Sequence, residues 1–136
     1  EVLTLHVAGL DQDRIVNCGG VWLLPVGDSQ FRCGATYDWG CSDSTPTPEG
    51  RKLIEKRLGR FLMLPYEVID HQAAVRPVVR KSRLLCGMHP ACGRVGFFNG
   101  LGSKGVLNAP FFARNFADYL CGSGAIDPEV DLCGNI

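Results

Sequence analysis

Apolar and polar positions alternate in short runs through the first half of the chain, which predicts β-strands rather than helices. These runs span residues 1–7, 21–25 and 31–37. The last two are joined by Val26-Gly-Asp-Ser-Gln30, whose glycine, aspartate and serine favour a tight turn, so we expect a β-hairpin there. A longer extended segment covers residues 66–79 and contains Pro77, which indicates a bulge or an edge strand.

Helical spacing of apolar residues appears twice. Thr47 is a good N-cap and Pro48 suits a first turn, so we expect a helix over residues 48–62. Its core-facing residues are Leu53, Ile54, Leu58, Phe61 and Leu62. The second helix follows a hairpin of residues 84–99 and ends near Leu120; we expect Pro110 to be tolerated only near its first turn, so the regular helix starts close to Val106.

Together these patterns predict an α+β fold. We expect a mixed, mostly antiparallel sheet, one packed amphipathic helix at about 48–62 and a C-terminal strand-turn-helix at about 94–120, with residues from 127 onward as a tail. A chain of 136 residues is one domain or part of one. It begins without methionine, directly in strand-like sequence, which we interpret as a cut inside a larger protein.

Charge and cysteine content limit the classes of partner and the cellular compartment that we expect. The chain has fourteen basic and fourteen acidic residues, so its net charge gives no reason to expect a nucleic-acid partner. No apolar run reaches the roughly 20 residues of a membrane span. Seven cysteines without a tight framework fit reduced thiols, so we expect a cytoplasmic protein. The oligomeric state stays open.

The glycine pattern Gly100-Leu-Gly-Ser-Lys-Gly105 matches G-x-G-x-x-G and follows a strand-like segment. A dinucleotide fingerprint also needs a second strand with an acidic residue about 20 positions later, and here the acidic residues fall in the Pro-containing tail. Two other interpretations stay open. The glycines serve only a tight strand-to-helix turn, or the turn and helix N-terminus face another ligand, such as the negatively charged edge of a reduced flavin.

The order of several motifs carries a resemblance to a known family. The motifs are Val21-Trp-Leu-Leu-Pro25, Gly34-Ala-Thr36, Thr47-Pro48, Ala74-Val-Arg-Pro77, Asn99-Gly-Leu-Gly-Ser-Lys-Gly-Val106 and Ala109-Pro110. From about Val2 to Leu120 the chain resembles the C-terminal part of FAD-dependent oxidoreductases of the D-amino-acid oxidase superfamily, which includes glycine oxidase. The resemblance implies that residues 1–93 belong to the substrate-binding sheet domain and 94–120 to the last strand-turn-helix of the FAD-binding domain. Residues 121–136 would be a tail, and the N-terminal dinucleotide-binding half is absent.

The resemblance also implies roles for single residues. Arg76 matches the arginine that binds the substrate carboxylate, a task suited to a planar guanidinium. Lys104 resembles a lysine aimed at the carboxylate or the flavin edge, and Trp22 stands where some relatives use a tyrosine, so it either walls the pocket or fills the core. The residues expected against the FAD pyrimidine are Gly100, Leu101, Gly102, Ser103, Lys104 and Gly105. The alternatives without a functional role are a solvent-exposed strand arginine for Arg76 and a surface lysine beside a turn for Lys104.

The implied activity is oxidation of an amine or amino acid by hydride transfer to flavin N5. We expect a small carboxylate-bearing amine as substrate and an isolated chain that is inactive. The alternative is a non-enzymatic module that binds a small ligand or a metal. Cys86-x-x-His89-x-x-Cys92 has a spacing that would suit zinc, but no fourth ligand is evident nearby, so no metal site is expected.

Overall fold

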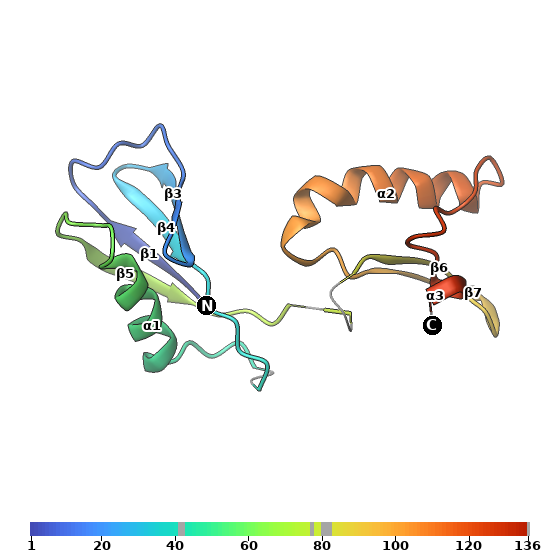
Figure 1. Ribbon diagram of the computed structural model, residues 1–136, viewed down its shortest axis with the longest axis horizontal. Coiled ribbons are helices and arrows are strands. Elements are labelled where there is room, and N and C mark those ends of the chain that lie inside the picture. Colours follow the sequence, from blue (N-terminus) through green and yellow to red (C-terminus); the bar gives the residue numbers. More distant parts are fainter. Residues whose placement is uncertain (41–42, 77, 80–82, 136) are drawn as a thin grey trace. The chain divides into compact units, whose positions relative to one another are not determined.

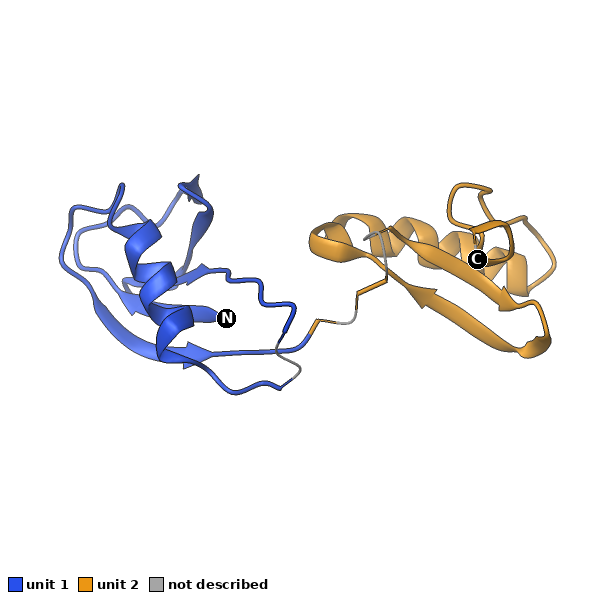
Figure 2. Cartoon of the chain, turned by 60° about the horizontal axis from the view of Figure 1, so that its bottom comes forward, with its two compact units in different colours: residues 1–75 blue, residues 76–136 orange. Residues whose placement is uncertain are grey.

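A computed structural model describes residues 1–40, 43–76, 78–79 and 83–135. The chain divides into two compact units, residues 1–75 and residues 76–136, coloured separately in Figure 2. Each unit combines antiparallel strands with helices, so the α+β class is confirmed. No helix among the described residues is long and apolar enough to cross a membrane.

Unit 1 is built on a five-stranded sheet with the order β2-β3-β4-β1-β5 (Figure 1). All its neighbouring strands run antiparallel. The strands are β1 (Val2–His6), β2 (Val16–Cys18), β3 (Val21–Gly27), β4 (Gln30–Gly34) and β5 (Glu67–Gln72). The sequence patterns located β1, β3, β4 and β5, whereas the three-residue β2 was not predicted.

The predicted hairpin is formed by β3 and β4. Its turn consists of Asp28 and Ser29, whose φ angles are 51° and 57°. Two successive left-handed residues are the geometry of a type I′ turn, whose twist matches that of the flanking strands. The hairpin therefore sets the register in which Trp22 lies opposite Gly34.

The core of unit 1 lies between the sheet and α1 (Pro48–Leu58). Alternate strand residues point to it, including Leu3, Leu5 and Phe31, and α1 contributes Ile54 and Leu58. The helix ends at Leu58 rather than at the predicted residue 62. Gly59 closes it in αR conformation, and Leu62 reaches the same core from the following turn.

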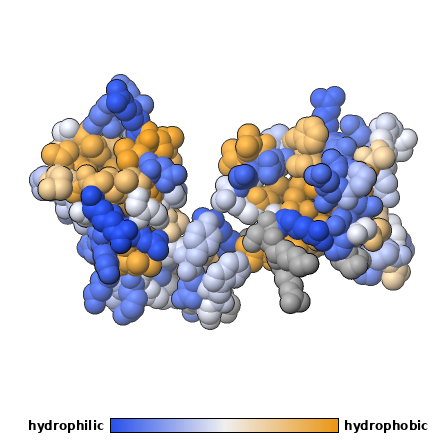
Figure 3. Space-filling model, viewed as in Figure 1, coloured by the Kyte–Doolittle hydropathy of each residue, from blue (hydrophilic) through white to orange (hydrophobic). Residues whose placement is uncertain are grey.

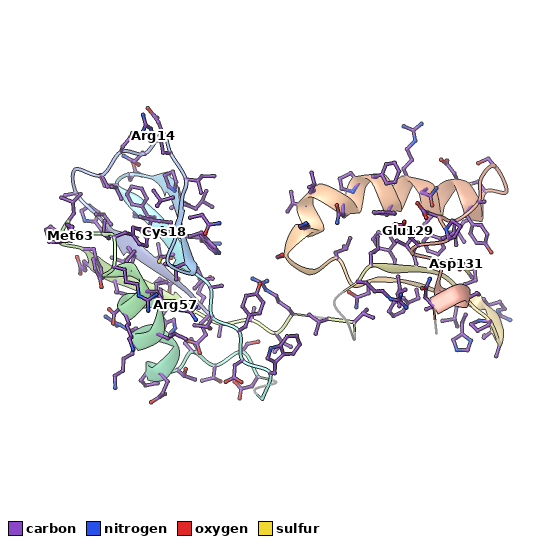
Figure 4. The ribbon with its side chains drawn as sticks, viewed as in Figure 1. Arg14, Cys18, Arg57, Met63, Glu129 and Asp131 are labelled. Atoms are coloured by element: carbon purple, nitrogen blue, oxygen red, sulfur yellow. The ribbon has the colours of Figure 1, made fainter. Side chains whose placement is uncertain are left out.

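Two contacts fix the ends of α1. The Thr47 side chain accepts a hydrogen bond from the Gly50 N–H at 3.0 Å, so the predicted N-cap is confirmed. Near the other end, Arg57 Nη1 donates to the Gly20 carbonyl at 3.3 Å, and Figure 4 shows this side chain. The helix is thereby tied to the loop between β2 and β3.

Unit 2 consists of the hairpin β6 (Leu85–His89) and β7 (Cys92–Asn99), the 3₁₀ turn η2 (Gly102–Lys104) and helices α2 (Gly105–Leu120) and α3 (Leu132–Asn135). Phe112 and Phe116 of α2 pack on the cluster centred on Cys86. Pro110 lies inside α2, beyond the first turn, so our placement of it was wrong. Proline there forfeits one backbone hydrogen bond, the one to the carbonyl of Val106, and Val106 is 97% exposed.

Residues 130–132 pack against β6 within unit 2, so the prediction of a tail was wrong. Val130 and Leu132 are buried, and the Cys86 N–H donates to the Val130 carbonyl at 2.8 Å. Asp131, labelled in Figure 4, accepts from the Cys133 N–H at 3.0 Å where α3 begins. Two apolar residues in a short segment carried too little periodicity to predict this contact.

The boundary between the units also differs from the expected one. We placed it between residues 93 and 94, but β6 and β7 pair with each other across that point, and the compact units divide between Val75 and Arg76. The assignment of these segments to substrate-binding and FAD-binding domains stays a prediction. The expected bulge at Pro77 lies outside the described residues.

Candidate functional site

The turn after β7 starts at Gly100, where the backbone conformation requires glycine. Gly100 has a φ angle of 89°, and a Cβ there would overlap the carbonyl oxygen of Arg83. Asn99 Oδ1 accepts from the Gly100 N–H at 2.7 Å. Gly100 is therefore explained by the fold alone, because it lets β7 turn away closely past Arg83.

The middle of the turn, at Gly102, faces open space. Gly102 has a φ angle of 57°, and no heavy atom of the described residues lies within 4 Å of the position that its Cβ would take. Ser103 and Lys104 are exposed. Neither η2 nor α2, both fully described, has a side-chain cap at its start. The first N–H groups of a helix without a cap are open to water or to an anionic ligand.

These features fit the edge of a flavin. Small residues allow a planar ring to approach the backbone, and a helix N-terminus carries a partial positive charge that favours negative charge nearby. Lys104 directly precedes α2 and adds a full positive charge to this edge. The six predicted cofactor residues are consecutive in the turn between β7 and α2, and their role toward FAD stays a prediction.

Trp22 lies on the sheet face opposite the core of unit 1. Its neighbours Val21 and Leu23 are buried, whereas Trp22 is half-buried. Its Cζ2 atom lies 3.3 Å from where a Cβ of Gly34 would be, so the indole ring extends across Gly34. Of the two roles left open for Trp22, filling the core of unit 1 is therefore excluded.

Arg76 is exposed and follows the end of β5 by four residues. It is assigned with Lys104 to unit 2, whereas Trp22 belongs to unit 1. The proposed roles of these three side chains toward a substrate stay predictions.

The segment Cys86-x-x-His89-x-x-Cys92 does not bring its side chains to one point. Cys86 is buried in β6, and His89 Nδ1 accepts from the Ala91 N–H at 3.2 Å. Burial raises the pKa of the Cys86 thiol, and the carboxylates of Asp131 and Asp127 raise it further, so a metal-binding thiolate is disfavoured. Across the described residues, no group of three metal-ligating side chains comes together.

A polar cluster that the sequence patterns did not predict joins Glu1, Thr47 and His71. His71 Nε2 lies 2.7 Å from Glu1 Oε2, and the Thr47 hydroxyl donates to Glu1 Oε1 at 2.7 Å. These residues are far apart in sequence, and no local motif links them. Only the pairing of Val2 with Gln72, which sets β1 beside β5, brings Glu1 to His71.

Comparison with known proteins finds likeness both in sequence and in structure. No protein-family model matches the chain. The tRNA 5-methylaminomethyl-2-thiouridine biosynthesis bifunctional protein MnmC of Marinobacter nauticus is 31% identical, over 79% of this chain and 19% of MnmC. Among solved structures, iminodiacetate oxidase of Chelativorans sp. BNC1 superposes with a TM-score of 0.73 at 22% identity, covering 91% of this chain and 35% of the oxidase chain.

These comparisons confirm the resemblance, drawn from the ordered motifs, to the C-terminal part of a FAD-dependent oxidoreductase of the D-amino-acid oxidase superfamily. The structural likeness shows the shared fold, and the chain spans about a fifth of MnmC and about a third of the oxidase.

Proposed function

We propose that the polypeptide carrying this chain is a FAD-dependent oxidoreductase that oxidises an amine or amino acid bearing a carboxylate, and that this chain alone is inactive. The observation that carries the proposal is the open, uncapped glycine turn at Gly102–Gly105, which suits the edge of a flavin. When bound, FAD supplies the acceptor at N5 for a hydride from the substrate Cα–H.

The turn would act by electrostatics. The N–H groups at the starts of η2 and α2, together with the positive end of the α2 dipole, favour negative charge at the pyrimidine edge of the ring. Lys104 adds to the same effect from its position just before α2. The electrostatic role of the turn requires no side chain that transfers a proton.

Arg76 would orient the substrate. Its guanidinium can form two parallel hydrogen bonds to one carboxylate, which fixes both the position and the rotation of the substrate. Such orientation lowers the barrier because the reacting C–H bond is already aligned when the substrate binds. Trp22, pointing away from the core of unit 1, would form a wall of the substrate pocket.

The exposed side of α2 supports an upstream domain that covers it. Val106, Leu107, Phe111 and Leu120 are 97%, 76%, 66% and 57% exposed. Val106, Pro110, Ala113, Ala117 and Leu120 recur at spacings of four and three, which places them along one stripe of the helix. Figure 3 shows apolar residues at the surface over α2. An apolar helix face of this kind is normally covered, and the greater length of both similar proteins supports covering by the FAD-binding half.

The two similar proteins suggest substrates to try first. One is named as an oxidase of iminodiacetate, an amine with two carboxylates. The other is named for synthesis of a methylaminomethyl nucleoside in tRNA. A carboxylate-bearing amine fits the proposed arginine contact better than a neutral amine does.

The test uses the full-length polypeptide with iminodiacetate and N-methylglycine as probes. We expect a purified protein with a flavin absorbance spectrum, and Arg76→Ala to raise KM about tenfold or more, since a hydrogen bond to a charged group contributes ~1.5–3 kcal/mol. Arg76→Lys should recover only part of this loss. Arg14→Ala is the matched control, because Arg14 is exposed and its ion pair is with the nearby Asp11.

The outcomes separate two parts of the proposal. A full-length protein that retains no flavin and oxidises neither probe would overturn the enzyme and leave a small ligand-binding module. An active flavoprotein in which Arg76→Ala behaves like Arg14→Ala would overturn only the carboxylate role of Arg76.

A further inference from the structure

The sheet of unit 1 has one face that α1 covers and one face that α1 leaves open. Leu23 and Phe31 are buried on the covered face. The residues next to them in sequence point the other way, because successive side chains of a strand alternate in direction. α1 is the only helix that the structure describes in unit 1, so no described helix of this unit lies on the opposite face. We call this opposite face the open face; it carries Trp22, Leu24 and Arg32.

Arg32 lies in the middle of the open face. Its strand β4 is the third of the five in the sheet, and the register sets Arg32 opposite Leu24 of β3 on one side and Thr4 of β1 on the other. Arg32 is exposed, and its guanidinium has no ion pair or hydrogen bond with any described residue. A planar cation with five N–H donors is therefore available on this face.

The acidic residue in the same row of the sheet does not neutralise Arg32. Asp70 of β5 lies opposite Thr4, one strand further from Arg32. Its Oδ1 accepts from the His71 N–H at 2.8 Å, and its Oδ2 accepts from Gln72 Nε2 at 2.7 Å. Both carboxylate oxygens are thus engaged by the neighbours of Asp70 along β5, which leaves the charge of Arg32 to a group from outside.

Trp22 supplies an apolar surface next to Arg32. It pairs with Gly34, and its indole Cζ2 lies 3.3 Å from the position that a Cβ of Gly34 would take. Gly34 is two residues from Arg32 on β4, so both positions belong to the open face. Diagonal neighbours on adjacent strands are about 7–8 Å apart, which is within reach of aromatic and long side chains. The indole and the guanidinium can therefore contact the same small ligand.

The chemistry of this pair suits a carboxylate on a short carbon chain. The guanidinium can form two parallel hydrogen bonds to the carboxylate, and the indole can pack against the adjoining methylene group. Iminodiacetate and N-methylglycine differ at this point, because the first has a second carboxylate that the second lacks. An apolar methyl group offers the guanidinium no acceptor, so the open face distinguishes the two compounds.

We propose that Arg32 is a specificity-determining residue that binds a second carboxylate of the substrate beside Trp22, so that the favoured substrates are amines with two carboxylates. This inference rests on the proposed function, in which Trp22 forms a wall of the substrate pocket. Arg32 takes no part in the hydride transfer. Its effect therefore appears in the preference between substrates and not in kcat.

The test measures kcat and KM of the full-length flavoprotein for iminodiacetate and for N-methylglycine. We expect Arg32→Ala to raise KM for iminodiacetate about tenfold or more, since one lost hydrogen bond to a charged group weakens binding by about that factor. KM for N-methylglycine and both kcat values should change by less than about twofold. Arg32→Lys keeps the charge without the paired donors and should recover only part of the loss. Arg14→Ala, at another exposed arginine, is the control.

A binding measurement supports the kinetic one without turnover. The Kd of malonate, which has two carboxylates, should rise about tenfold in Arg32→Ala when followed by flavin absorbance, whereas the Kd of acetate should stay the same. The melting temperature of each variant shows whether it folds. Should Arg32→Ala not fold, Arg32→Gln takes its place, because glutamine keeps a polar side chain without the charge.

Each outcome bears on the proposal. If Arg32→Ala raises KM equally for both amines, Arg32 does not select the second carboxylate and the proposal is overturned. It is also overturned if Arg32→Ala behaves like Arg14→Ala in an active enzyme, and in that case the proposed function stands. A full-length protein that retains no flavin and oxidises neither amine would overturn the proposed function and this inference together.

Discussion

The two units of this chain complete their cores to very different degrees. Unit 1 encloses fully buried residues such as Leu3, Leu5 and Phe31 between its sheet and α1. In the described part of unit 2 the buried cluster comprises Leu84, Cys86 and Val130, and α2, described along its whole length, contains no buried residue. Among the helices of the described residues, the longest is thus the least covered.

This difference shows which unit leaves more apolar surface uncovered by its own residues. Burial of apolar area is the main stabilising term in folding, so a sheet that buries alternate residues under a helix is close to self-sufficient. A hairpin with one half-covered apolar helix is less self-sufficient, because much of its apolar surface stays exposed. The exposed glycine turn and α2 belong to the second kind, in keeping with the proposal that an additional domain and a cofactor bind there.

Replacement of Gly100 by alanine should have the largest effect, and that effect should be confined to unit 2. The methyl group would overlap the Arg83 carbonyl and the φ angle of 89° is strained for alanine, so we expect a loss of about 4 kcal/mol or more. Hydrogen exchange of the β6 and β7 amides measures it. Gly9→Ala, with a φ angle of 78° and open space around it, should cost only about 1 kcal/mol. Equal losses would show that the close approach to Arg83 does not matter.

Leu5→Ala and Leu107→Ala compare the two cores directly. Leu5 is completely buried, so its truncation should cost about 2–5 kcal/mol in urea unfolding followed by tryptophan fluorescence. Leu107 is 76% exposed, so the same change should stay within about 0.5 kcal/mol in this chain, followed by hydrogen exchange in α2. In the full-length polypeptide Leu107→Ala should become clearly destabilising. No increase there would contradict coverage of α2 by the upstream domain.

Acidification should weaken unit 1 by a smaller amount through Glu1. Burial raises the pKa of Glu1, but the hydrogen bonds from Thr47 and the contact with His71 outweigh it. The folded pKa of Glu1 therefore lies below its ordinary value of 4.5, so the contribution of the carboxylate is present above that pH and is lost as pH falls through the folded pKa. The difference in unfolding free energy between the unmodified chain and Glu1→Gln should therefore shrink as the pH drops. Glu49→Gln, on the exposed first turn of α1, is the control. A difference that is constant with pH would show that the polar cluster of Glu1, Thr47 and His71 does not depend on ionised Glu1.

Much of the candidate site was predictable because its signals are local. The G-x-G-x-x-G spacing located the turn, and the strand and helix on either side of it were found where their periodicity placed them. The direction of Trp22 was left open, because alternation shows that it and Val21 face opposite ways but not which way is inward. The inward face is the one that carries Val21 and Leu23, because α1 covers it.

The sequence by itself determined the elements whose causes lie within a few residues of each other. Alternation specified β1, β3 and β4, and Thr47 with Pro48 specified the start of α1. Only the tertiary structure joined Glu1 to His71, packed Val130 against β6 and kept Pro110 inside α2. The physical reason is the distance along the sequence over which each interaction acts. Propensity, capping and turn chemistry act between near neighbours, whereas sheet register and the packing of one element on another depend on residues that the fold alone brings together.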